Sequence, residues 1–137
     1  MNWEECIRSR VVEKRTKDKE LAKSLFKIAA DRFSFFSSKN ISVFTLEGIY
    51  ESIIELCHAL LALEGLKTVS HECVIEFLRK KYLNDYETEL LHKLRKKRHG
   101  IKYYGKILSE EILKRNVEIG KTLFLKLKSI IEEKLTE

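Results

Sequence analysis

The sequence contains no proline and only five glycines in 137 residues. Folds with many strands need these residues at regular intervals for their turns, so an all-β or α/β domain is disfavoured and a helical domain is favoured. Long apolar runs are also absent, which excludes a membrane-spanning helix of about 20 apolar residues. Because 44% of the residues are apolar, the chain has enough of them for a core, and we expect a single domain over residues 1–137.

Cysteine is scarce, because Cys6, Cys57 and Cys73 are the only three in the chain. An odd number without C-x-x-C spacing favours reduced thiols over a disulfide framework. Cys57-His58 and His71-x-Cys73 contain the ligand types of a zinc site, but adjacent residues of a helix point about 100° apart. We therefore interpret the cysteines as small buried side chains and predict no metal and no cofactor.

Residues 1–15 show no pattern of a secretory signal. Glu4 and Glu5 stand where such a signal is basic, and no apolar segment follows them. We therefore expect a cytoplasmic protein. Apolar side chains recur at helical spacing in the same residues but are interrupted by four bases, which predicts either a short helix or an arm.

The rest of the chain repeats apolar residues at spacings of three and four, the pattern of amphipathic helices. Each repeat follows a residue that caps helices well, and the expected N-caps are Thr16, Ser42, Ser70, Asn84 or Asp85, and Ser109. Stop signals follow at Ser37-Ser38-Lys39-Asn40 and at Gly65. These elements predict an all-α fold, an up-and-down bundle of four to five helices.

The helix expected between Ser42 and Gly65 has the widest apolar surface. Such a surface predicts the central, most buried helix of the bundle, and it is also a candidate contact with a second subunit. His58 is the exception on this helix. We favour a hydrogen-bonded histidine in the core or at its edge, with a functional histidine as the alternative if it faces the basic residues described next.

No acidic residue occurs between Glu89 and Glu110, although the chain has 21 acids. This interval holds seven of the 27 Lys and Arg residues, at positions 93, 95, 96, 97, 98, 102 and 106. The other residues hold 20 bases against 21 acids, so the net charge of +6 is concentrated here. A polyanion, such as a phosphodiester or a nucleotide, is the natural partner of such a surface.

On a helix, this basic run has two faces. At 100° per residue, the basic face holds Arg95, His99, Lys102 and Lys106, and the apolar face holds Leu90, Leu94, Ile101 and Leu108. We expect the helix to continue through Gly100 and to end near Tyr104 or Gly105. A plain solvated face is the simpler interpretation, but ordinary surface helices mix charges of both signs.

The run Leu94-Arg95-Lys96-Lys97-Arg98-His99-Gly100-Ile101-Lys102-Tyr103-Tyr104-Gly105 resembles the signature region of the HEPN superfamily (higher eukaryotes and prokaryotes nucleotide-binding). It looks most like that of small stand-alone archaeal members, and the order of elements agrees, including the apolar second helix around residues 50–60. The resemblance implies a HEPN-like helical bundle that forms a symmetric homodimer with one cleft between two motif helices. Many members are metal-independent endoribonucleases, often toxins paired with a nucleotidyltransferase-type antitoxin, whereas others bind nucleotides or RNA without known cleavage.

The catalytic signature of that family is an arginine, four to six residues, and then a histidine. In this sequence Arg95 and His99 enclose three residues, whereas Lys93 has five between it and His99. For cleavage by the ribose 2′-OH, the chemistry of the side chains suits His99 to general acid or base catalysis and Arg95 to charge stabilisation, with Arg98 as the alternative. The residues expected to bind phosphate or bases are Arg98, Lys102, Tyr103, Tyr104 and Lys106.

Two other interpretations need no catalysis. In one, the basic face binds phosphates of RNA or of a nucleotide, and the protein is a binding module or the helical partner of an antitoxin. In the other, the basic face meets an acidic partner protein. One of the two tyrosines is expected to pack under the last helix, and Tyr104 lies nearer the apolar side than Tyr103.

Overall fold

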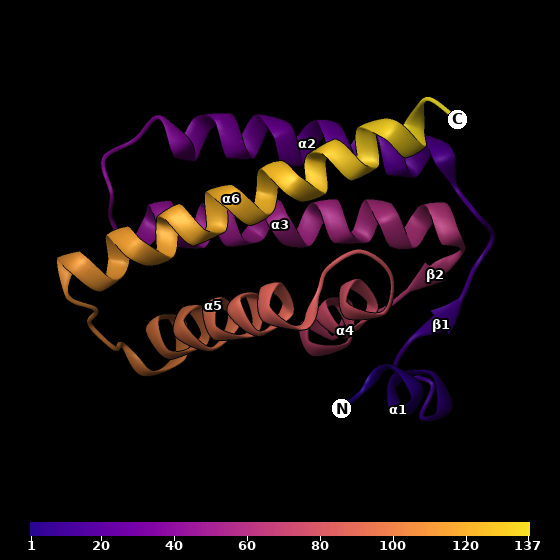
Figure 1. The fold of residues 1–137 in the computed structure, drawn as a ribbon, viewed down its shortest axis with the longest axis horizontal. Helices are drawn as coiled ribbons and strands as arrows, with labels where there is room; N and C mark the ends of the chain where they lie inside the picture. The colour runs from indigo at the N-terminus through magenta and orange to yellow at the C-terminus, as the bar shows by residue number, and fades with distance from the viewer.

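The computed structural model describes residues 1–137, and its helices contain 76% of them, which confirms the all-α prediction. There are six helices, more than the four to five expected, and one antiparallel pair of two-residue strands (Figure 1). The elements are α1 (Trp3–Arg8), β1 (Glu13–Lys14), α2 (Lys19–Ser37), α3 (Val43–Glu64), β2 (Leu66–Lys67), α4 (His71–Lys81), α5 (Asp85–Tyr104) and α6 (Glu110–Leu135).

Most helices begin and end where the sequence predicts. Ser42, Ser70, Asn84 and Ser109 are the N-caps of α3, α4, α5 and α6, and each side-chain oxygen accepts a hydrogen bond from a backbone N–H of the first turn. Gly65 and Gly105 end α3 and α5 in the left-handed conformation that favours glycine. Local capping chemistry therefore sets these boundaries.

The prediction that Thr16 caps the first long helix is wrong, because Asp18 caps α2 and accepts a 2.9 Å hydrogen bond from Leu21 N. Two sets of tertiary hydrogen bonds, which no sequence pattern predicted, hold the chain before Asp18 in an extended conformation. β1 pairs with β2, and Arg15 N donates to the carbonyl of Gly65 at 2.9 Å. Helix α2 therefore begins only after the residues that these hydrogen bonds hold.

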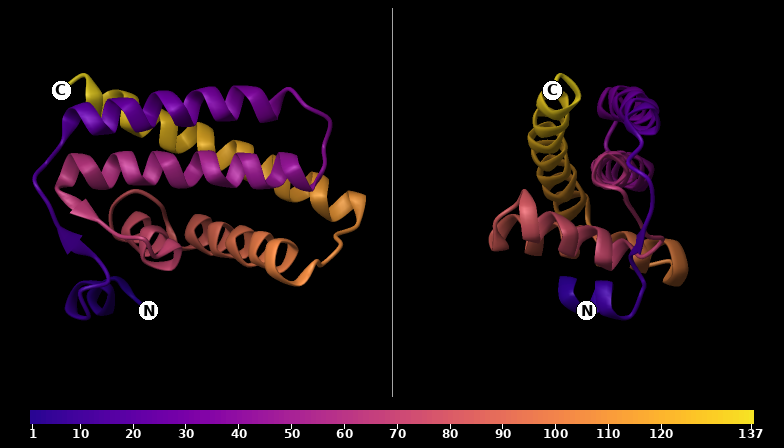
Figure 2. Two further views of the ribbon diagram at one scale, coloured as in Figure 1. Left: turned by 180° about the vertical axis from the view of Figure 1, so that it is seen from behind. Right: turned by 90° about the vertical axis from the view of Figure 1, so that its right-hand side faces the viewer.

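Helix α3 lies at the centre of the bundle. It contacts α2, α4, α5 and α6, with α2 on one side of it and α4 and α5 on the other (Figures 1 and 2). Its fully buried side chains include Ile49, Ile53, Leu56 and Leu60. Apart from Phe44, which is 71% exposed, the apolar side chains of this helix are buried or half-buried within one chain, so most of its apolar surface gives no argument for a second subunit.

The N-terminal helix α1 packs on α4, on the side of α4 that faces away from the bundle (Figure 2). Trp3 and Phe77 meet there with ring centroids 5.6 Å apart. A disulfide joins Cys6 to Cys73, which corrects the prediction of three reduced thiols. The pairing escaped prediction because the two cysteines are 67 residues apart and meet only through the docking of α1.

The remaining cysteine, Cys57, is free and buried in the core. Since Cys73 is bonded to Cys6, it is not a free thiolate ligand beside Cys57. No group of three or more metal-ligating side chains occurs. None of the six helices combines the length and the apolar character needed to cross a membrane.

Candidate anion-binding surface on α5

Helix α5 carries the basic run on its C-terminal half. Asn84 and Glu87 form a capping box at its start, with backbone N–H to side-chain distances of 2.8 and 3.0 Å. Acids stand in the first turn and cations near the end, which is the arrangement that the helix dipole favours. Of the seven Lys and Arg in the run, only Arg98 has a carboxylate oxygen within 4.0 Å. The positive charge of α5 is therefore largely unpaired.

One flank of α5 forms a hollow of about 330 Å³, here named the lysine hollow. Its lining residues are Lys93, Lys96, Lys97, Gly100, Lys106 and Leu108. No acid is among them. Four ammonium groups around a space of this size repel one another unless an anion or counterions lie between them, so the hollow attracts anions.

The turn at Gly105 closes the lysine hollow. Gly105 has φ +60°, and the N–H groups of both Gly105 and Lys106 point at the carbonyl of Gly100, the latter at 3.2 Å. This reversal folds Lys106 back over Gly100, where a Cβ would lie 3.1 Å from the Lys106 Cδ atom. A glycine at position 100 thus lets the lysine side chain lie close to the helix.

The expected basic face of Arg95, His99, Lys102 and Lys106 is therefore incomplete. Because α5 ends at Tyr104 and the chain turns at Gly105, Lys106 joins the lysine hollow instead of continuing the Arg95 face. Lys93, Lys96 and Lys97 were not predicted as site residues. Their positions relative to Gly100, at spacings of three, four and seven, are those of one helix face and could have revealed them.

Arg95 lies on the other flank and is tied to a histidine that the sequence analysis did not single out. Its Nε donates to Nδ1 of His92 at 3.3 Å, and His92 Nε2 lies 2.7 Å from Oε2 of Glu76 on α4. Both His92 and Glu76 are buried. His92 was missed because its carboxylate partner belongs to another helix, 16 residues away in sequence.

Arg98 is turned inward. One terminal nitrogen donates to Glu51 Oε1 on α3 at 3.1 Å, and its guanidinium carbon lies 5.7 Å from the ring centroid of Tyr50. Only 15% of its side chain is exposed, and its Nε has no hydrogen-bond partner. Arg98 therefore connects α5 to α3 and offers little surface to a phosphate, in contrast to Arg95.

The end of α5 is aromatic and exposed. The ring of His99 lies 4.7 Å from that of Tyr103 and 5.6 Å from that of Tyr104, and Lys102 Nζ lies 5.4 Å from the Tyr103 centroid. Tyr103 and Tyr104 are 59% and 72% exposed, so the expectation that one of them packs under the last helix is wrong. The structure thus brings together His99, Lys102, Tyr103 and Tyr104 as an accessible group.

A second histidine, which the sequence suggested only as a zinc ligand, lies near Arg95 and Arg98. His71, the first residue of α4, has its Nδ1 3.0 Å from the hydroxyl of Tyr50. Burial lowers the pKa of His71, and the cations Arg98, Arg95 and Lys102 lower it further, whereas Glu51 raises it. Burial also lowers the pKa of His58. Both rings therefore favour the neutral form near pH 7.

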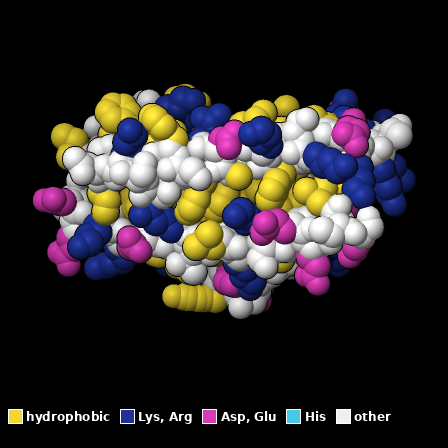
Figure 3. Space-filling model, turned by 90° about the horizontal axis from the view of Figure 1, so that it is seen from above, with side chains coloured by type: hydrophobic (Ala, Val, Ile, Leu, Met, Phe, Trp, Pro, Cys, Tyr) yellow, Lys and Arg dark blue, Asp and Glu magenta, His cyan; other side chains and the backbone are white.

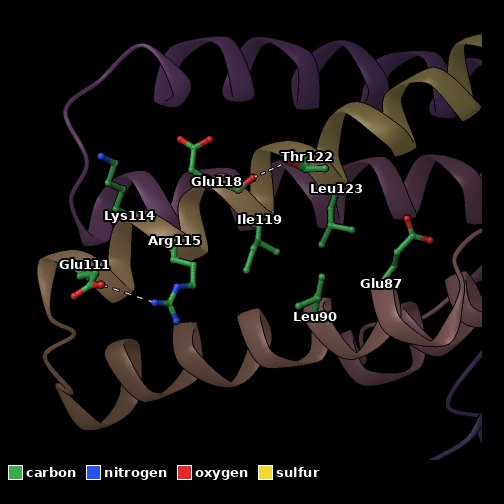
Figure 4. A pocket seen from close by; sticks show the side chains of 9 residues that line it. All are labelled: Glu87, Leu90, Glu111, Lys114, Arg115, Glu118, Ile119, Thr122 and Leu123. Carbon is green, nitrogen blue, oxygen red and sulfur yellow. Dashed lines mark hydrogen bonds and ion pairs between the residues drawn. The ribbon is translucent and has the colours of Figure 1, made fainter.

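A larger groove, of about 550 Å³, lies between α5 and α6 (Figure 4). Its apolar residues are Leu90, Ile119 and Leu123, and its charged rim mixes Glu87, Glu111 and Glu118 with Lys114 and Arg115. The face formed by α2 and α6 also shows both signs of charge beside apolar side chains (Figure 3). Neither surface has the single sign of charge that distinguishes the lysine hollow.

Comparison with protein-family models, with curated proteins and with solved structures gives no match.

Proposed function

We propose that the protein binds phosphate groups of RNA or of a nucleotide through the C-terminal half of α5, as a HEPN-like module. The lysine hollow carries this proposal, because four lysines converge there without a carboxylate among the lining residues. A volume of about 330 Å³ is at the lower end of ligand pockets, which fits a phosphate and its immediate surroundings. Salt bridges elsewhere in the chain neutralise many of the other cations.

Single-stranded nucleic acid is the form of RNA that fits this surface. Tyr103 and Tyr104 are 59% and 72% exposed, about two to three turns beyond the lysines of the helix that line the hollow. A base that stacks on an aromatic side chain gains about 1–3 kcal/mol, and an accessible ring next to cations suits a strand whose bases are unpaired. His99 and Lys102 lie against the same rings.

Fluorescence anisotropy with a labelled single-stranded RNA oligonucleotide tests the proposal. Changing Lys93, Lys96, Lys97 and Lys106 to Ala should weaken binding at least tenfold. The magnitude of the slope of log affinity against log salt should fall by at least about 0.7, the contribution of one phosphate contact in a single strand.

A control variant of equal charge carries Ala at Lys23, Lys27, Lys67 and Lys80, which are exposed lysines that each lie near a carboxylate. Its affinity should fall less, and its salt slope should stay near that of the unchanged protein. Equal losses in both variants would show that net charge alone attracts RNA. An unchanged protein that does not bind RNA or nucleotide would refute the proposal.

Metal-independent RNA cleavage is the second candidate function, and the absence of carboxylate partners for Arg95 and His99 favours it. Neither side chain is paired with a carboxylate, and they are four residues apart on one side of α5. In this reaction His99 accepts the proton of a ribose 2′-OH while the oxygen attacks the adjacent phosphorus. The 5′-oxygen leaves and takes up a proton, which gives a 2′,3′-cyclic phosphate and a 5′-hydroxyl, and Arg95 stabilises the phosphorane charge.

Incubation of the purified protein with structured RNA in EDTA decides between cleavage and binding alone. Arg95→Ala and His99→Ala should each abolish formation of cyclic-phosphate ends while leaving the helical circular dichroism unchanged. Equal cleavage by the His99→Ala protein would indicate a contaminating ribonuclease. Binding without cleavage would support the non-catalytic module, which the shorter Arg-to-His spacing favours.

We propose further that the protein forms a homodimer, with a nucleotidyltransferase-type protein as its antitoxin partner. The resemblance of residues 94–105 to the HEPN signature supports this part of the proposal. Light scattering at micromolar concentration should give twice the 16.2 kDa of one chain. A mass of one chain would count against the dimer and would leave the RNA-binding proposal to its own test.

A further inference from the structure

We propose that His92 is a positioning residue, which holds the guanidinium of Arg95 in place for a phosphate before the phosphate arrives. This inference rests on the proposed function of α5. It starts from the one hydrogen bond that Arg95 makes within the protein, from its Nε to Nδ1 of His92 at 3.3 Å. The two terminal nitrogens of Arg95 remain free, and these form the fork that binds phosphate oxygens.

The contact fixes the tautomer of His92. An arginine can only donate hydrogen bonds, so Nδ1 of His92 must be the acceptor and carries no proton. The proton of the ring is therefore on Nε2, which faces Oε2 of Glu76 at 2.7 Å and donates to it. Both ring nitrogens are thus occupied, and His92 is only 8% exposed. The ring cannot rotate without losing both bonds.

Glu76 is itself fixed from its other side. Arg79 donates to both of its oxygens, from Nε at 3.0 Å and from a terminal nitrogen at 3.3 Å. Arg79 also binds Asp85 at 2.9 Å and Glu89 at 2.6 Å, the first near the start of α5 and the second one turn further along. Arg79 therefore holds both oxygens of Glu76, which keeps the carboxylate in position to accept the proton of His92 Nε2.

These bonds form one chain, Arg79–Glu76–His92–Arg95, which leads from α4 to the surface of α5. A long side chain that is already held in its binding geometry loses less conformational entropy when it meets a ligand. Packing alone does not require a hydrogen bond between Nδ1 of the histidine and a partly exposed arginine. The geometry of the chain thus assigns His92 to the orientation of Arg95.

Two substitutions remove the hydrogen bonds of the two His92 ring nitrogens one at a time. In His92→Asn the side-chain oxygen takes the position of Nδ1 and still accepts from Arg95, whereas the bond to Glu76 is lost. In His92→Gln the side-chain amide takes the position of Nε2 and still donates to Glu76, whereas the bond to Arg95 is lost. Affinity for the single-stranded RNA oligonucleotide and thermal unfolding are measured for each protein.

We expect His92→Asn to bind RNA within about twofold of the unchanged protein, and His92→Gln to show most of the loss caused by Arg95→Ala. Adding His92→Gln to Arg95→Ala should cause no further loss, because the histidine acts only through the arginine. Wild-type affinity in His92→Gln, or a loss in His92→Asn as large as in His92→Gln, would overturn the proposal.

A second readout does not depend on RNA or on the folding of any variant. Long-range ¹H–¹⁵N correlation spectra of the unchanged protein should show His92 with a proton on Nε2 and none on Nδ1. A ring with its proton on Nδ1 would overturn the positioning role whatever the RNA result. If the expected tautomer is found but the unchanged protein binds no RNA, the proposed function fails while the geometry of His92 stands.

Discussion

The hydroxyl of Tyr50 lies 3.0 Å from Nδ1 of His71, which joins the middle of α3 to the first turn of α4. Burial raises the pKa of Tyr50 and lowers that of His71, so each group favours its neutral form. A neutral His71 with its proton on Nε2 accepts the hydrogen bond from the tyrosine. This pair lies close to the cations of α5 and couples the stability of the fold to pH.

The stability of the protein should decrease as the pH falls below about 6.5. The pKa values of His58 and His71 are lowered from 6.5 in the folded state, so at lower pH the unfolded chain takes up protons that the folded chain does not. The loss extends from pH 6.5 down to the folded-state pKa values. Thermal unfolding followed by circular dichroism at pH 7.5, 6.5 and 5.5 measures it, and His71→Gln should show a weaker dependence on pH.

The pH range of the stability loss also distinguishes the contribution of the two histidines from that of the ion pair between Met1 and Glu72. Glu72, whose pKa is lowered mainly by its bond to the Met1 amino group, contributes stability that is lost only below about its ordinary pKa of 4.5. The Met1 amino group has a raised pKa, so its contribution is lost only as the pH rises above about 8. An identical pH dependence in His71→Gln and the unchanged protein would contradict the assignment to His71.

Removal of the disulfide should destabilise the protein by about 2–4 kcal/mol. The bond between Cys6 and Cys73 closes a long loop, with a sequence separation of 67, and so restricts the unfolded chain. Chemical denaturation of Cys6→Ser with and without dithiothreitol measures the effect, and the reductant should change only the unchanged protein. Thiol titration in denaturant should find one reactive thiol, from Cys57, and a count of three would refute the bond.

Two glycine substitutions in buried positions should have different effects on the stability of the fold. A Cβ on Gly48 would overlap the ring of Phe36, so Gly48→Ala should destabilise the fold by about 1–3 kcal/mol. A Cβ on Gly100 meets only the flexible Lys106 side chain, and Ala favours a helix over Gly by up to about 1 kcal/mol. Gly100→Ala should therefore be neutral or stabilising in urea denaturation. Equal destabilisation by both substitutions would contradict the packing around Gly48.

Much of the fold could be predicted because its determinants are local. Ser42, Ser70, Asn84 and Ser109 cap their helices with side chains that reach backbone groups two or three residues away. The end of α5 at Gly105 follows from the left-handed conformation that glycine adopts without strain. Thr16 failed as a cap although its chemistry was suitable, because the strand pairing of residues 13–14 with 66–67 holds the preceding chain extended.

The candidate site was predicted in part. The excess of positive charge was visible because it depends on composition alone, and Arg95 and His99 do remain free of carboxylates. The inward turn of Arg98 was not visible, since its partner Glu51 lies 47 residues away on α3. Neither was the hollow around Gly100, which exists only because the turn at Gly105 returns Lys106 to the helix.

The sequence by itself determined the helical class, most helix boundaries and the place of the unpaired charge, because spacing, capping and the absence of acids act within a few residues. Only the tertiary structure decided which side chains meet: Cys6 with Cys73, Glu76 with His92, and Lys106 with the lysines of α5. These contacts join groups from different elements or across a turn. They are fixed by how the helices pack and where the chain reverses, which no local pattern encodes.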